Sequence, residues 1–112
     1  MNPQTNTTDE LIVILCTVPS LEVGESLAHG LVEAQHAACV NVISGVLSVY
    51  RWDGAVQKEH EAQLLIKTRA SRFEHVSSYL REHHPYEVPE ILALPIRGGA
   101  EAYVQWVLES TP

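Results

Sequence analysis

Basic residues are scarce in this chain. Only 7 residues are Lys or Arg, against 14 Asp and Glu, so the formal net charge is -7 at pH 7. Nucleic acid is therefore disfavoured as the main partner, because neutralising phosphate groups requires a basic face. A Gly-rich phosphate loop is also missing, since Gly98-Gly99 has no lysine behind it and lacks the spacing of such loops. An acidic chain tends instead to attract cations.

Long apolar runs and export signals are absent as well. No run approaches the roughly 20 apolar residues of a membrane span, and the first residues show no basic segment followed by an apolar core. The only two cysteines are Cys16 and Cys39. We therefore expect a cytoplasmic protein that has no membrane partner and keeps both thiols reduced.

The pattern of apolar residues predicts one domain over residues 10–112, preceded by a disordered polar leader over residues 1–9. Its strands and helices alternate in the order β-α-β-β-α-β, followed by a last helix. This order is typical of the ferredoxin-like α+β fold, a four-stranded antiparallel sheet with two helices on one face. The expected elements are a strand over 11–18, a helix from Ser20 to about Ala38, strand segments over 39–43, 46–52 and 55–68, a helix from Ser71 to His84, a strand over 90–96 and a helix over 100–109.

The middle of the chain predicts a long β-hairpin. Side chains alternate from Val46 to Trp52 and again over 55–68, and Asp53-Gly54 between them suits a type I′ turn. Such a hairpin exceeds the usual strand length of about five or six residues. Its edges and the open face of the sheet must be covered, so the pattern predicts that subunits associate.

The densest group of chemically active side chains is Arg81-Glu82-His83-His84-Pro85-Tyr86-Glu87-Val88-Pro89-Glu90. We expect a Ser71–Glu74 capping box to start the helix before it and Pro85 to end that helix. The apolar stripe of this helix predicts that His83 points toward the sheet and that His84 lies in a frayed last turn. Imidazoles with carboxylate or thiolate can bind copper or zinc, although a capped helix end with solvated histidines explains the same residues.

Five motifs in the chain resemble those of the CutA divalent-cation tolerance family, and the resemblance extends from about Leu11 to Leu108. They are AACVN at 37–41, SVYRWDG at 48–54, EAQLLIKT at 61–68, HPYEVPE at 84–90 and YVQW at 103–106. The resemblance implies a cytoplasmic homotrimer of ferredoxin-like subunits, similar in architecture to the PII signalling proteins and linked to heavy-metal tolerance. Bacterial members are described as binding copper.

The resemblance also implies a ligand set when it is carried over by position. The metal ligands would be Cys16, His83 and His84, with Glu90 as a fourth, holding about one copper ion, or zinc, per subunit. Gln35 and His36 depart from the family pattern, because many members have a basic residue followed by Leu there. From the helical pattern alone, we expect His36 to be a solvated helix residue.

Two alternatives to a metal-binding trimer remain open. One is a signalling or scaffolding trimer that binds a small ligand or a protein in clefts between subunits. Its cleft residues would be Tyr50, Trp52, Glu61, Lys67 and Tyr86, although the aromatic residues suit a buried interface equally well. The other is an enzyme that uses Cys16 with a neighbouring histidine, but no third positioning group or oxyanion motif is present. We therefore expect no catalysis.

Overall fold

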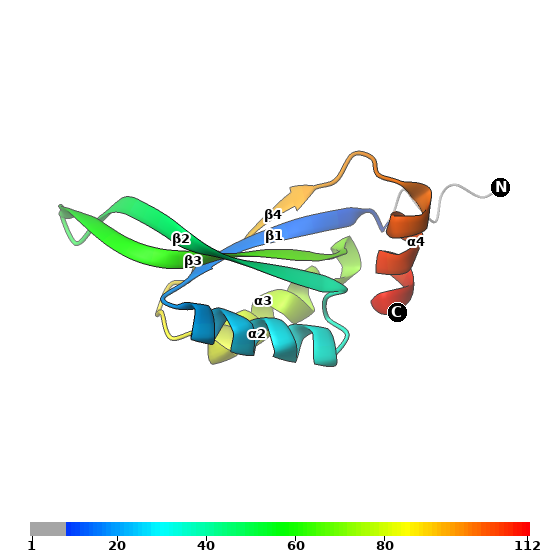
Figure 1. The fold of residues 1–112 in the computed structure, drawn as a ribbon, viewed down its shortest axis with the longest axis horizontal. Coiled ribbons are helices and arrows are strands. Elements are labelled where there is room, and N and C mark those ends of the chain that lie inside the picture. The colour runs from blue at the N-terminus through cyan, green and yellow to red at the C-terminus, as the bar shows by residue number, and fades with distance from the viewer. Residues whose placement is uncertain (1–8) are drawn as a thin grey trace.

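A computed structural model describes residues 9–112 as a twisted sheet that is covered by helices on one face (Figure 1). The four strands form one antiparallel sheet in the order β2-β3-β1-β4. The predicted α+β ferredoxin-like fold with a C-terminal helix is confirmed. Residues 1–8 of the predicted leader lie outside the described residues. The elements are β1 (Leu11–Val18), α2 (Leu21–Glu33), β2 (Cys39–Trp52), β3 (Ala55–Arg69), the 3-10 turn η1 (Ala70–Arg72), α3 (Phe73–His83), β4 (Leu92–Pro95) and α4 (Glu101–Ser110).

β1 occupies an inner position of the sheet, and its side chains alternate between two environments. Its continuous run of apolar residues would suit burial on both faces, but only the face toward α2 and α3 is fully buried. The helices cover one face, so the opposite side chains stay partly accessible. The helix-facing residues of β1 and β3 form most of the core: Ile12, Ile14, Cys16, Val18, Ala62, Leu64 and Ile66.

The long hairpin is confirmed. β2 and β3 pair from Cys39 opposite Lys67 to Trp52 opposite Ala55, with one irregularity between Ile43 and Val46. Asp53 and the glycine after it have φ angles of 54° and 78°, as a type I′ turn requires. The outer half of the hairpin extends beyond the helical layer (Figure 1), which leaves both of its faces uncovered within one subunit.

The start of α3 differs from its prediction. The predicted capping box is wrong, because the Ser71 N–H and hydroxyl both donate to the Asp9 carboxylate, at 3.0 and 2.9 Å. The chain therefore makes the turn η1 first, and Arg72 precedes the helix without a side-chain cap. By contrast, α2 begins where the sequence predicted, and Ser20 caps it, since its hydroxyl accepts the Val23 N–H at 3.2 Å.

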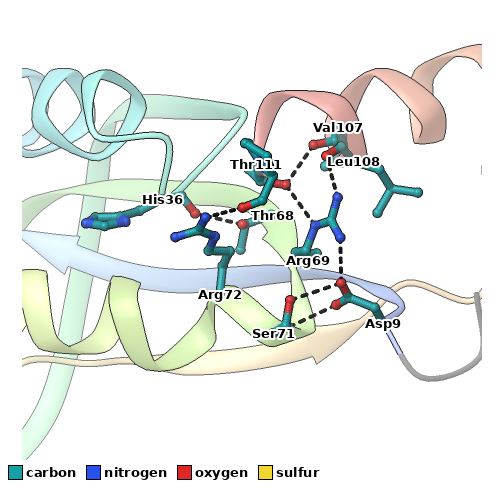
Figure 2. Close-up of polar contacts among 10 residues, drawn as sticks. Asp9, His36, Thr68, Arg69, Ser71, Arg72, Val107, Leu108 and Thr111 are labelled. Atoms are coloured by element: carbon teal, nitrogen blue, oxygen red, sulfur yellow. Dashed lines mark hydrogen bonds and ion pairs between the residues drawn. The ribbon is translucent and has the colours of Figure 1, made fainter. Parts of the chain in front are cut away.

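A polar network attaches α4 to the end of β3 (Figure 2). The Arg69 guanidinium donates to Asp9 at 2.7 Å, to the Thr111 hydroxyl at 3.2 Å and to the Leu108 carbonyl. The Thr111 hydroxyl in turn donates to the Val107 carbonyl at 2.8 Å. Arg69 therefore joins the start of β1, the end of β3 and the end of α4.

The apolar residues of α4 do not share one environment. Val107 is buried at 1% exposure, whereas Tyr103 and Trp106 are 45% and 44% exposed. The inward turn of α4 contacts only a small satellite cluster with Leu11 and Ala38, and its aromatic residues remain at the surface.

Gly30→Ala is expected to destabilise the protein by about 1–3 kcal/mol, because a Cβ atom there would lie 1.8 Å from the Tyr79 hydroxyl oxygen. In an unobstructed helix the same change stabilises by about 1 kcal/mol. Chemical denaturation of both proteins at equal concentration measures the sign. In a Tyr79→Phe background the loss should shrink, because the nearest atom is gone. A more stable Gly30→Ala protein would show that α2 and α3 do not pack in this way.

Candidate functional site

An open cleft lies on the uncovered face of the sheet, where the end of β1 meets the hairpin and the segment after α3. Its volume is about 530 Å³. Acidic and aromatic side chains form most of its walls, and we call it the acidic cleft. It is lined by Thr17, Ser48, Tyr50, Trp52, Glu61, Pro85, Tyr86, Glu87, Val88 and Glu90.

The pleat of the strands decides which residues enter the acidic cleft. Successive side chains of a strand point to opposite faces, so Ser48, Tyr50 and Trp52 share one face of β2. For the same reason Thr17 lines the cleft, while Cys16 beside it faces the helices at 0% exposure. The sheet itself therefore separates the Cys16 thiol from the cleft.

The acidic cleft carries a concentrated negative charge. The Tyr86 hydroxyl donates to the Glu61 carboxylate at 2.6 Å. Burial, this hydrogen bond and the charges of Glu61 and Glu59 hold the pKa of Tyr86 well above its usual value. Burial, with the charges of Glu59 and Glu61, also raises the pKa of Tyr50. No Lys or Arg is among the described residues that line the cleft.

His84 ties the segment after α3 to the end of β1, next to the acidic cleft. Its Nε2 donates to the Thr17 carbonyl at 2.8 Å, and its Nδ1 accepts the Tyr86 N–H at 3.0 Å. The prediction of a frayed His84 is wrong, because the residue is only 7% exposed. Pro85 supplies the reason: the residue before a proline is driven out of the helical region, and the extended His84 backbone turns its ring back toward β1.

His83 also differs from its prediction, but in the opposite direction, because it is more exposed than expected. It was predicted to point toward the sheet, but it is exposed and stacks on Tyr79 with ring centroids 4.2 Å apart. Its Nδ1 lies 2.9 Å from the carbonyl oxygen of Tyr79, one turn earlier in α3. The apolar stripe of α3 ends at Leu80, so the last turn is free to present His83 to solvent.

The four predicted metal ligands are not brought to one point within a subunit. Burial, with the charges of Glu90 and Glu61, raises the pKa of the Cys16 thiol to about 12. The thiolate that copper or zinc needs is therefore disfavoured. Both His84 nitrogens are engaged, and His83 points elsewhere, so Glu90 alone of the four lines the acidic cleft. In residues 9–112, no three His, Cys, Asp or Glu side chains form a ready metal site.

The predicted cleft residues come together better. Tyr50, Trp52, Glu61 and Tyr86 all line the acidic cleft. Lys67 does not, because it lies near the other end of β3, with its Nζ 5.9 Å from the centroid of the Tyr103 ring.

Sequence reasoning missed five residues of the cleft wall. The alternation along β2 could have identified one of them, and three lie in the HPYEVPE segment that the resemblance had already marked. The fifth follows Cys16 and had no signal of its own, because its role depends on which face of the sheet the helices cover. The five are Ser48, Pro85, Glu87, Val88 and Thr17.

Comparison with known proteins gives consistent matches along the chain. The family profile described as "CutA1 divalent ion tolerance protein" matches residues 12–110. "Protein CutA, chloroplastic" of Arabidopsis thaliana is 46% identical over 100 residues, which are 89% of this chain and 55% of that protein. "Divalent-cation tolerance protein CutA" of Thermus thermophilus is 46% identical over 99 residues, 88% of this chain and 96% of that one.

Solved structures agree with the sequence matches. The structure described as "Divalent cation tolerance protein (Cut A1)" from Thermus thermophilus superposes with a TM-score of 0.89 at 45% identity, covering 91% of this chain and 99% of that one. The CutA1 structure from Oryza sativa gives a TM-score of 0.89 at 43% identity, covering 91% and 94%. The chain spans only 55% and 60% of the length of the two plant relatives in sequence. No helix in the part of the chain that the structure describes is long and apolar enough to cross a membrane.

Proposed function

The chain belongs to the CutA1 divalent ion tolerance family, and from this premise we propose that it acts in divalent-cation tolerance as a cytoplasmic homotrimer. Each subunit binds about one divalent metal ion at the acidic cleft. Copper is the first metal to test, because it heads the affinity order of the divalent first-row metals, and zinc is the second. The proposed role is binding without catalysis.

The charge of the acidic cleft is the observation that supports this proposal most directly. Carboxylates of Glu61, Glu87 and Glu90 line one hollow, and its described lining residues include no Lys or Arg. Carboxylate and water ligands accept divalent cations, and a concentrated negative potential raises their local concentration. Because the described residues 9–112 do not assemble three ligands at one point, the remaining positions fall to water or to a neighbouring subunit.

The uncovered surface supports the proposed trimer. Apolar side chains are exposed along the hairpin and on the edge strand β4, and such exposed apolar patches usually mark an interaction surface. β4 itself is exposed at all four residues and has a free edge. Covering these residues with further copies of the chain removes them from water. The most exposed include Leu47, Val49, Trp52, Val56, Leu92 and Leu94.

Native mass spectrometry during titration with Cu(II) and then Zn(II) tests assembly and metal content together. We expect a trimer that gains about one ion per subunit, with Cu(II) bound more tightly. The double variant Glu61→Gln, Glu90→Gln should lose most of this binding. Its matched control is Glu22→Gln, Glu25→Gln, which removes the same charge from the exposed face of α2. Equal metal uptake by both double variants would reject the cleft as the metal site, and a monomer would reject the trimer.

A signalling trimer that binds a small ligand between subunits is a second candidate function. The volume of about 530 Å³ and the aromatic walls of the acidic cleft favour it, because a lone metal ion needs neither. If the titration shows no metal in the cleft, a screen of small organic cations by thermal stabilisation becomes the decisive measurement. Stabilisation that disappears in Trp52→Ala would support this candidate.

A further inference from the structure

A second group of metal-ligating side chains lies away from the acidic cleft, in the helical layer. His36 follows α2 and His75 lies on α3, and their ring centroids are 5.5 Å apart with planes inclined by 36°. Tyr79 stands beside them, with its ring centroid 6.1 Å from that of His36. Together with Glu74 and Glu82, these residues line a hollow of about 290 Å³.

The backbone holds His36 in a fixed position. Gln35 before it adopts a positive φ of 62°, which reverses the chain after α2. The His36 N–H then donates to the Leu31 carbonyl at 2.9 Å. Its own carbonyl accepts the hydroxyl of the fully buried Thr68 at 2.7 Å (Figure 2). Hydrogen bonds to both its N–H and its carbonyl fix the backbone of His36, so little further ordering of this residue is needed when it binds a metal.

The Nδ1 atom of His36 has no hydrogen-bond partner. It is the only buried side-chain nitrogen or oxygen in this condition among residues 9–112. Buried polar atoms in folded proteins nearly always have a partner, so this one requires an explanation. Burial, with the nearby charges of His75 and Arg72, also lowers the pKa of His36. The Nδ1 atom of His36 therefore retains a bonding capacity that no described residue satisfies.

We propose that His36 and His75 together bind one divalent transition-metal ion, represented by Zn²⁺. When one metal ion binds two imidazole nitrogens, each bond is about 2.0–2.1 Å long. The two ring centroids then lie several ångströms apart, which is compatible with the 5.5 Å between His36 and His75. Because the described residues hold no ready three-ligand site, water or the carboxylates of Glu74 and Glu82 fill the other positions. This site is separate from the acidic cleft and goes beyond the proposed function.

Imidazole ¹⁵N NMR of the full chain during titration with ZnCl₂ tests the proposal. We expect the nitrogen signals of His36 and His75 to move first among the 6 histidines. His36→Gln and His75→Gln should each weaken this Zn²⁺ binding by at least the roughly 10–100-fold that loss of a mere supporting partner costs. The control is His29→Gln, which removes an exposed imidazole of α2 and should change nothing. Unchanged affinity in both test variants, or equal shifts of all histidines, would overturn the proposal.

The double variant Glu61→Gln, Glu90→Gln separates this site from the cleft. If the histidine signals still respond to Zn²⁺ in that protein, the two-histidine site stands on its own. If they no longer respond, the proposal of a separate site fails. Failure of the acidic cleft to bind metal in the wild-type chain leaves the response of His36 and His75 as an independent result.

Discussion

His84→Ala is expected to lower the free energy of unfolding by roughly 3–5 kcal/mol. The change removes a buried ring and leaves two backbone groups without partners, the Thr17 carbonyl and the Tyr86 N–H. It also removes the ring that packs against Tyr86, with centroids 4.7 Å apart. Denaturant unfolding at equal protein concentration measures the loss, because the stability of an assembling protein depends on its concentration.

His83→Ala is the matched control, since it removes the same side chain one residue earlier. Because His83 is exposed, its replacement should lower the free energy of unfolding by less than about 1 kcal/mol, as surface substitutions usually do. Equal losses in the two variants would show that His84 does not occupy a buried position. His84→Asn and His84→Gln should fall between the extremes, because each amide can reproduce one of the two ring hydrogen bonds. A purely metal-dependent role would instead leave the metal-free proteins equally stable.

Arg69→Ala is expected to cost about 2–4 kcal/mol, because the guanidinium makes charge-assisted hydrogen bonds to three groups at once. Loss of the side chain leaves the Asp9 carboxylate without its cation and releases the end of α4. Hydrogen exchange should therefore increase most in α4 and at the start of β1. Thermal and denaturant unfolding give the size of the loss. Arg97→Ala is the control, since it removes an exposed arginine.

Asp9→Asn removes the charge that Arg69 contacts, and its effect on stability is expected to depend on pH. Burial raises the pKa of Asp9, but hydrogen bonds from Ser71 and Arg69, with the charge of Arg69, outweigh it and leave the pKa below its usual value. Because the pKa of Asp9 is lower in the folded state, its ionised carboxylate stabilises the protein at pH values above the unfolded-state pKa of about 3.9. This stabilisation is lost as the pH falls through the folded-state pKa. The stability difference between wild type and Asp9→Asn should therefore be full at about pH 6 and vanish in strong acid. A difference that stays constant with pH would contradict the ionised contact.

Local patterns in the sequence were enough to predict most elements of the fold. The strand over Leu11–Val18 and the hairpin turn at Asp53-Gly54 were correct, because strand composition and turn chemistry depend on neighbours in the chain. The last strand was predicted over 90–96 but is shorter, Leu92–Pro95. The start of α3 failed for a different reason. Ser71 bonds to Asp9, which is 62 residues away in the sequence, and no local pattern reports such a contact.

The candidate site was predictable in its residue types and less so in its geometry. Four of the five predicted cleft residues meet, and for two of them, Tyr50 and Trp52, alternation along β2 already indicated a shared face. The orientation of the two adjacent histidines was reversed, because it depends on how Pro85 turns the chain against β1. His36 was expected to be a solvated helix residue, yet it follows α2, its Nδ1 is buried, and its ring lies beside His75 and Tyr79 of α3. The trimer, the metal and the cytoplasmic location stay predictions.

The sequence by itself determined the class of fold, the long hairpin, the acidic character and the membership of a family, because these follow from composition, periodicity and motifs. Tertiary structure alone decided which groups meet. The helices cover only one face of the sheet, so Cys16 is enclosed as a neutral thiol while Thr17 beside it opens onto an acidic cleft. Side-chain direction in a strand reverses at every residue, and only the packed fold shows which of the two sides is buried.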